Sequence, residues 1–169
     1  TALWPQSFQF SNPTTSNFNN PKSSYTENSG PSCMISWKKA RRIVMQAVYQ
    51  WLMTSNEPFQ IAAQFREANS SKIDWDYFDE VFLSIPSCQK SIEDQLRPVI
   101  DREIDALDMI EKALLYISVF ELTKLTDIPY RGVINECVEL AKTFGASDSH
   151  KYVNGVLDKL ARKLRSDEM

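Results

Sequence analysis

The sequence predicts an all-α protein. Apolar residues recur at helical spacing in long segments of the 169-residue chain, and only four glycines interrupt it. The clearest segment, residues 127–159, has the pattern of two amphipathic helices joined by a short turn. At this length the chain is expected to form one domain with enough residues to bury an apolar core.

The first 35 residues differ in composition from the rest. Up to Cys33 they are rich in Ser, Asn, Thr and Pro and contain one lysine and one glutamate. Such a segment buries too little apolar area to offset the entropy of ordering its backbone, and it lacks the basic start and apolar centre of a secretion signal. We therefore expect residues 1–35 to be a disordered N-terminal extension and residues 36–169 to be the helical domain.

Five helices are expected before residue 127. Each has an apolar stripe at helical spacing, and two begin after an aspartate that would accept hydrogen bonds from the first N–H groups of the helix. These aspartates are Asp74 and Asp108, and the second forms a pattern like a capping box with Glu111. The expected helices span residues 36–54, 56–67, 75–85, 87–98 and 109–124.

Two further helices make up the clearest segment. Pro129 opens the first, since its fixed φ suits a first helical turn, and Gly145 is expected to end it by adopting a left-handed φ. Ser147 or Asp148 would cap the last helix. Gly155 lies inside that helix, where glycine costs about 1 kcal/mol relative to alanine, so we expect a close helix–helix contact there.

Composition argues against several classes of function. The formal net charge of −3 means that any nucleic-acid surface is a local patch. Three cysteines without a CxxC pair indicate reduced thiols in a cytoplasmic protein, and a single histidine argues against a zinc site. The sequence contains no catalytic grouping and no apolar run of membrane length. We therefore expect a binding protein without metal, cofactor or catalytic activity.

Two zones of the sequence are basic. The first turns of the first helix carry Lys38, Lys39, Arg41 and Arg42. Cations at a helix N-terminus are unfavourable by roughly 0.3–1 kcal/mol each, so their presence suggests a phosphate partner; a merely solvated basic turn is the alternative. The second zone, on the last helix, consists of Lys151, Lys159, Arg162, Lys163 and Arg165.

Tyr152 lies off the apolar stripe of the last helix. In that position its ring would stack on a nucleic-acid base, an interaction worth about 1–3 kcal/mol per base. Packing at the edge of the core is the alternative for this ring.

The last third of the chain resembles a known family. The run INECVELAKTFGASDSHKYVNGVLDK is similar to the end of NusB antitermination factors, which have an INEAVELAK-type run, then FG, then KFVNGVLDK. Upstream, ALLYISVFELTK matches the family's LRIALYEL-type helix, with Tyr116 in place of the usual arginine. The resemblance covers residues 36–165. It starts within a few residues of Met34, which we hypothesise to be the native start.

This resemblance implies seven helices in two small packed bundles. It also implies binding of single-stranded boxA RNA from ribosomal RNA leader transcripts, together with the small-subunit ribosomal protein NusE, in a complex that makes RNA polymerase resist termination. The starts of the first and last helices would together form the RNA surface, which would include Asp148, Ser149, Lys151 and Tyr152. The surface for the protein partner would include Tyr49 and Glu121.

Two other functions stay open at this point. A NusB-like domain also forms the first part of a ribosomal RNA cytosine methyltransferase, although this sequence ends soon after its last helix, without the length expected for a methyl-donor-binding domain. The other alternative is a self-associating helical protein, because some NusB proteins are homodimers and dimerisation can cover the RNA surface.

Overall fold

The structure, a computed structural model, describes residues 31–69 and 73–169, with side chains from residue 37 onward. Seven α-helices, a few 3-10 turns and no strand are found among these residues. The all-α prediction is therefore confirmed. The helices are α1 (Pro31–Thr54), α2 (Pro58–Ala68), α3 (Trp75–Phe82), α4 (Gln89–Leu96), α5 (Met109–Lys124), α6 (Tyr130–Phe144) and α7 (Ser149–Leu164).

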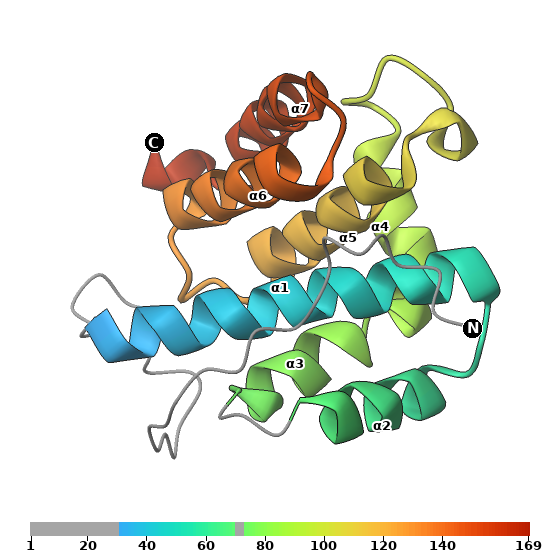
Figure 1. Ribbon diagram of the computed structural model, residues 1–169. Helices are drawn as coiled ribbons and strands as arrows, with labels where there is room; N and C mark the ends of the chain where they lie inside the picture. The colour runs from blue at the N-terminus through green and yellow to red at the C-terminus, as the bar shows by residue number, and fades with distance from the viewer. Residues whose placement is uncertain (1–30, 70–72) are drawn as a thin grey trace.

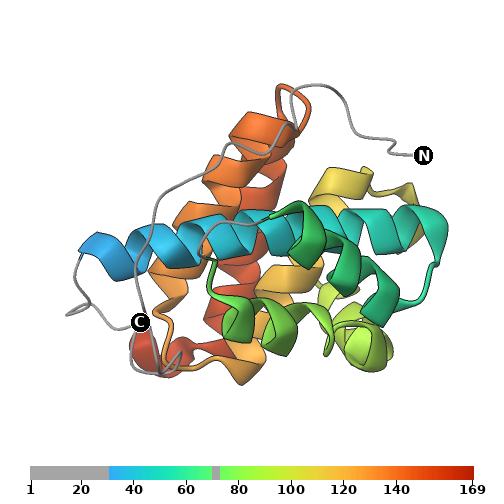
Figure 2. The same cartoon turned by 60° about the horizontal axis from the view of Figure 1, so that its bottom comes forward.

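Helix α5 is the centre of the fold. Every residue from 110 to 122 is buried, as expected for a helix with neighbours on all sides. It packs mainly against α1, α4, α6 and α7 and also touches α3, whereas α2 packs against α1 and α3. Figure 1 shows α1 between the α2–α3 pair and the α6–α7 pair, and Figure 2 brings α2 and α3 forward. The two packed bundles expected from the resemblance are thus α1–α3 and α4–α7.

The N-terminal boundary differs from the prediction. Helix α1 begins at Pro31, so the expectation of disorder for residues 31–35 is wrong. Proline is compatible with a first helical turn because its missing N–H would have no helical partner there. Residues 1–30 of the predicted extension lie outside the described residues, and the proposed native start at Met34 stays a hypothesis.

Two predicted helix caps are present. The Asp74 carboxylate accepts from the Tyr77 N–H at 3.0 Å. The Asp108 carboxylate accepts from the N–H groups of Ile110 and Glu111 at 3.0 and 3.4 Å. Both aspartates satisfy donors that the first helical turn leaves unpaired.

Gly145 ends α6 as predicted, but the reasons given for the two glycines are wrong. Gly145 ends α6 with φ −86° and ψ 174°, which is extended backbone and not the left-handed conformation. What requires glycine there is space: a Cβ atom would lie 2.7 Å from the Ala141 carbonyl oxygen and 2.8 Å from the Ser149 Cβ. Gly155, by contrast, is exposed, and a Cβ atom added to it would have no other atom within 4 Å. The predicted close helix–helix contact at Gly155 is therefore absent.

Replacing these two glycines by alanine should therefore change the free energy of unfolding in opposite directions. Gly155→Ala should raise the free energy of unfolding by about 0.5–1 kcal/mol, because alanine favours the helix and meets no neighbour. Gly145→Ala should lower it by about 1–3 kcal/mol, because the methyl group clashes with the α6 backbone and the start of α7. Urea unfolding measures both, and changes of the same sign would contradict this account.

Tyr116, at the position where the resemblance predicted an arginine, is a core residue. Its side chain is fully buried in α5, and its hydroxyl donates a short hydrogen bond to the Glu93 carboxylate on α4. Burial, with a further contribution from Glu93, raises the pKa of Tyr116 well above its usual range. The tyrosine therefore joins α4 to α5 in its neutral form.

The Tyr116 hydroxyl should make stability fall in alkali. Its pKa is higher in the folded chain than the unfolded value near 10, so its contribution is complete below about pH 10 and is lost as the pH rises further. Tyr116→Phe should cost about 1 kcal/mol at neutral pH and flatten the alkaline decline. Urea unfolding at several pH values between about 7 and 11 tests this. An unchanged alkaline slope in the variant would show that other groups cause it.

Candidate nucleic-acid interface

The basic segment of α1, residues 38–42, lies against α6. Because α1 begins at Pro31, this segment lies near the middle of the helix, and the expectation that its cations occupy the first helical turns is wrong. Lys38 is half exposed, with 51% of its side-chain area accessible, and its Nζ is 3.2 Å from Glu136 Oε1. The Arg42 guanidinium lies 4.8 Å from the ring centroid of Phe144, the last residue of α6. Lys39 is partly exposed beside them. Residues 38–42 of α1 are thus placed beside the end of α6, close to the turn that leads into α7.

Arg41 differs from its three basic neighbours because it lies inside the protein. Its side chain is 1% exposed and its Nη2 is 2.7 Å from Oε2 of Glu121, which is 0% exposed. The same nitrogen lies 3.1 Å from the Cys137 sulfur, and the Tyr77 hydroxyl donates a short hydrogen bond to the other Glu121 oxygen. Arg41 was expected to face RNA and Glu121 a protein partner. Both expectations are wrong, because both side chains are buried.

This interior cluster joins four helices, namely α1, α3, α5 and α6. Burial raises the pKa of the Glu121 carboxyl, and the Arg41 charge opposes that shift. Burial likewise raises the pKa of the Cys137 thiol, which lies in the core. Because ionised groups are costly to bury alone, Arg41 and Glu121 depend on each other for their place in the core.

The start of α7 is only partly exposed. Asp148 occupies the N-cap position without a side-chain capping bond, so the predicted cap is wrong; its carboxylate instead lies 3.3 Å from Lys151 Nζ, and both side chains are exposed. Ser149 is 3% exposed and lies against Gly145. Its predicted exposure to RNA is therefore wrong, whereas Asp148 and Lys151 are accessible.

Tyr152 packs under an arginine that sequence reasoning missed. The Arg102 guanidinium lies 4.3 Å from the centroid of the Tyr152 ring, which is half buried. Arg102 also donates two hydrogen bonds to Asp101, at 2.8 and 3.3 Å. Its donation to Asp101 holds the pKa of that carboxyl below its usual range. No local spacing indicates this contact, because Arg102 precedes α5 and reaches α7 only through the tertiary fold.

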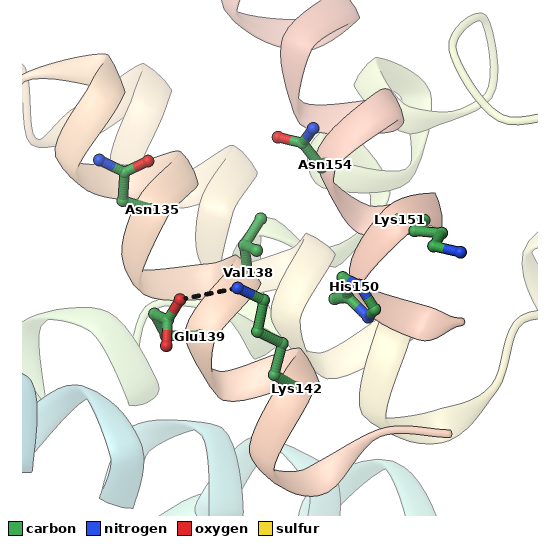
Figure 3. Close-up of a pocket in the computed structure, with 7 residues that line it drawn as sticks. All are labelled: Asn135, Val138, Glu139, Lys142, His150, Lys151 and Asn154. Atoms are coloured by element: carbon green, nitrogen blue, oxygen red, sulfur yellow. Dashed lines mark hydrogen bonds and ion pairs between the residues drawn. The ribbon is translucent and has the colours of Figure 1, made fainter. Parts of the chain in front are cut away.

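A shallow hollow of about 360 Å³ lies between α6 and α7. Figure 3 shows that Lys142 reaches back along α6 toward Glu139, with which it forms a 3.1 Å ion pair, while Lys151 points away from α6. His150, the single histidine of the sequence, lies on its wall. The lining residues are Asn135, Val138, Glu139, Lys142, His150, Lys151 and Asn154.

The comparisons with known proteins agree with this geometry. The family model described as "NusB family" matches residues 38–162. The chain belongs to the NusB family. The transcription antitermination protein NusB of Alcanivorax borkumensis is 47% identical over 82% of this chain and 93% of its own length. That of Pseudomonas fluorescens is 46% identical over 89% of this chain and 92% of its own.

Two solved structures share the NusB fold with this chain. NusB of T. maritima superposes with a TM-score of 0.68 at 23% identity and covers 78% of this chain and 94% of its own. A chain from a crystal structure of NusB and NusE in complex with double-stranded RNA gives a TM-score of 0.71 at 23% identity, covering 77% of this chain and 98% of its own. These likenesses confirm the NusB fold.

The remaining predicted site residues divide between surface and core. Tyr49 is half buried and packs against the core. In the second basic zone, Lys159, Arg162 and Lys163 are exposed, but Arg165 is 3% exposed and donates hydrogen bonds to main-chain carbonyls near the end of α5. Arg165 is therefore a structural residue in this NusB-family fold.

Two classes of site are not found in the part of the chain that the structure describes. No group of three or more His, Cys, Asp or Glu side chains in residues 31–69 and 73–169 is arranged to hold a metal ion. Within the same residues, no helix is both long enough and apolar enough to cross a membrane.

Proposed function

We propose that this NusB-family protein is a cytoplasmic transcription antitermination factor that binds boxA-type single-stranded RNA together with NusE. The observation that carries the proposal is its likeness to relatives named transcription antitermination protein NusB, over 92–93% of their length. The solved complex of NusB and NusE with RNA, whose NusB fold this chain shares, supports both kinds of partner. The assembly would act on RNA polymerase, and its function requires neither catalysis nor a cofactor.

The proposed RNA surface joins the basic segment of α1, residues 38–42, to the start of α7. It consists of Lys38, Lys39, Arg42, Asp148, Lys151 and Tyr152. The contact between Arg42 and Phe144 supports this proposal, because it holds the basic turns of α1 beside the α6–α7 turn. Lysines and arginines there would neutralise phosphates, and base contacts would supply the preference for boxA. Tyr49, at the partly buried edge of α1, stays the proposed NusE contact.

A salt-titrated binding assay tests this function. A boxA-like RNA and a scrambled RNA are compared with and without NusE, using the full chain and the Lys38→Ala/Lys39→Ala variant. The variant should bind more weakly, and its slope of log K against log salt should be shallower by about 0.7 for each lost phosphate contact. Lys90→Ala/Lys124→Ala, with the same charge change at exposed positions on α4 and α5, is the matched control.

The outcomes separate the alternatives. Preference for boxA that NusE strengthens, with loss only in the α1 variant, supports the proposal. If neither RNA binds at low salt with NusE present, the function is wrong; a dimer in the same samples would then favour a self-associating protein whose RNA surface is covered.

A further inference from the structure

We propose that Arg102 is a further RNA-binding residue and that Arg102 and Tyr152 together form one stacking platform for a base. The inference rests on the proposed RNA function and adds a residue from a segment that no sequence pattern connects to the RNA surface. Its basis is the position of the Arg102 guanidinium, 4.3 Å from the centroid of the Tyr152 ring, with 43% of the arginine side chain exposed.

The stacking explains how Tyr152 would take part although it is half buried. Arg102 covers its ring, so a base cannot simply lie on Tyr152. A guanidinium plane is itself a surface on which bases stack, and an aromatic ring beneath it holds it flat. A base would therefore stack on the face of the Arg102 guanidinium that points away from Tyr152, while the Tyr152 ring supports the opposite face.

This platform is continuous with the proposed RNA surface on α7. Asp148, the N-cap residue of α7, and Tyr152 are four residues apart and therefore lie on the same side at the start of the helix. Lys151, whose side chain is 73% exposed, lies beside them. A strand of RNA that passes the start of α7 would thus meet Lys151 and then Arg102 without leaving the surface.

Asp101 would act as a competitor for the RNA. Its carboxylate accepts from Nε and Nη2 of Arg102 in the absence of RNA, and 67% of the aspartate side chain is exposed. Exposed ion pairs contribute little to stability, so a phosphate can take the place of the carboxylate on the same donors. Asp101 would therefore weaken RNA binding while it holds the arginine in position.

The test measures binding of boxA RNA by the full chain in the presence of NusE. It uses three substitutions, of which two should weaken binding and one should tighten it. Arg102→Ala should weaken binding about 5- to 100-fold, as the loss of a stacking partner does, and make the salt slope shallower by about 0.7. Arg102→Lys should keep the slope but lose part of the affinity, because ammonium lacks the flat face. Asp101→Asn should tighten binding, because it frees Arg102 and removes a repelling charge.

The control for the charge change is Asp105→Asn. Asp105 follows in the same segment, its side chain is 99% exposed, and it pairs with Lys112 and not with Arg102. This variant should bind RNA like the unsubstituted protein. Equal tightening by both aspartate substitutions would mean a general charge effect, and it would overturn the specific role of Asp101.

A double-substitution cycle tests whether the two side chains form one platform. If they do, Arg102→Ala should cost much less affinity in a Tyr152→Ala background than in the unsubstituted protein. A purely structural Arg102–Asp101 pair predicts that Asp101→Asn lowers both the melting temperature and the RNA affinity, and that result would overturn the inference. If the unsubstituted chain binds boxA and Arg102→Ala binds equally well, the inference fails and the proposed function stands; if the unsubstituted chain binds no RNA, both fail.

Discussion

Replacing Glu121 by alanine should destabilise the protein by about 3–5 kcal/mol, the cost of leaving one member of a buried ion pair without its partner. Arg41 would keep its weaker contacts to the Val133 carbonyl and the Cys137 sulfur, but it would lose the buried carboxylate with which it pairs. The Tyr77 hydroxyl would also lose the carboxylate to which it donates. Urea or guanidinium unfolding at neutral pH measures the loss.

An exposed ion pair on α6 provides the control. Glu139 pairs with Lys142 at 3.1 Å with 67% of its side chain exposed, so Glu139→Ala should cost less than about 1 kcal/mol. Replacing both buried partners, as in Arg41→Met/Glu121→Leu, should recover most of the stability, because apolar side chains of similar size avoid burying charge. A Glu121→Ala variant as stable as Glu139→Ala would show that Arg41 reaches water and that the pair is not structural.

The sequence predicted those features whose cause is local. The apolar stripes of α6 and α7 show in the sequence because each repeats within one helix. Asp74 and Asp108 were assigned correctly because a capping bond reaches only two or three residues along the chain. The family resemblance supplied the arrangement of these helices, which periodicity alone does not contain.

The wrong predictions concern residues whose partners are distant in sequence. Charged residues such as Arg41, Glu121 and Arg165 are normally exposed, so a sequence argument places them at the surface unless their buried partners are known. The need for glycine at position 145 arises from the approach of Ser149, and not from its own φ. The Arg102–Tyr152 contact is of the same kind, since it joins the segment before α5 to α7.

Replacing Arg165 by alanine should cost about 3–4 kcal/mol, because several buried carbonyls lose a charged donor at once. The last carbonyls of a helix have no partner within it. One guanidinium, 3% exposed, donates over 2.7–3.3 Å to the carbonyl oxygens of Glu121 and Leu122 in the last turn of α5, and of Leu125 and Ile128 in the connection to α6. The arginine thereby fixes the end of α5, the connection to α6 and the end of α7 to one another.

Arg162, three residues earlier on the same helix, makes this prediction specific. It is exposed and pairs only with Asp158 in the neighbouring turn, so Arg162→Ala should change the free energy of unfolding by less than about 0.5 kcal/mol. Arg165→Lys should recover little of the loss, because a single ammonium group cannot match the spread of donors of a guanidinium. If Arg165→Ala unfolded like Arg162→Ala but bound RNA with a shallower salt slope, Arg165 would belong to the basic RNA surface after all. The burial of its side chain argues for the opposite result, a large loss of stability with an unchanged salt slope in the protein that remains folded.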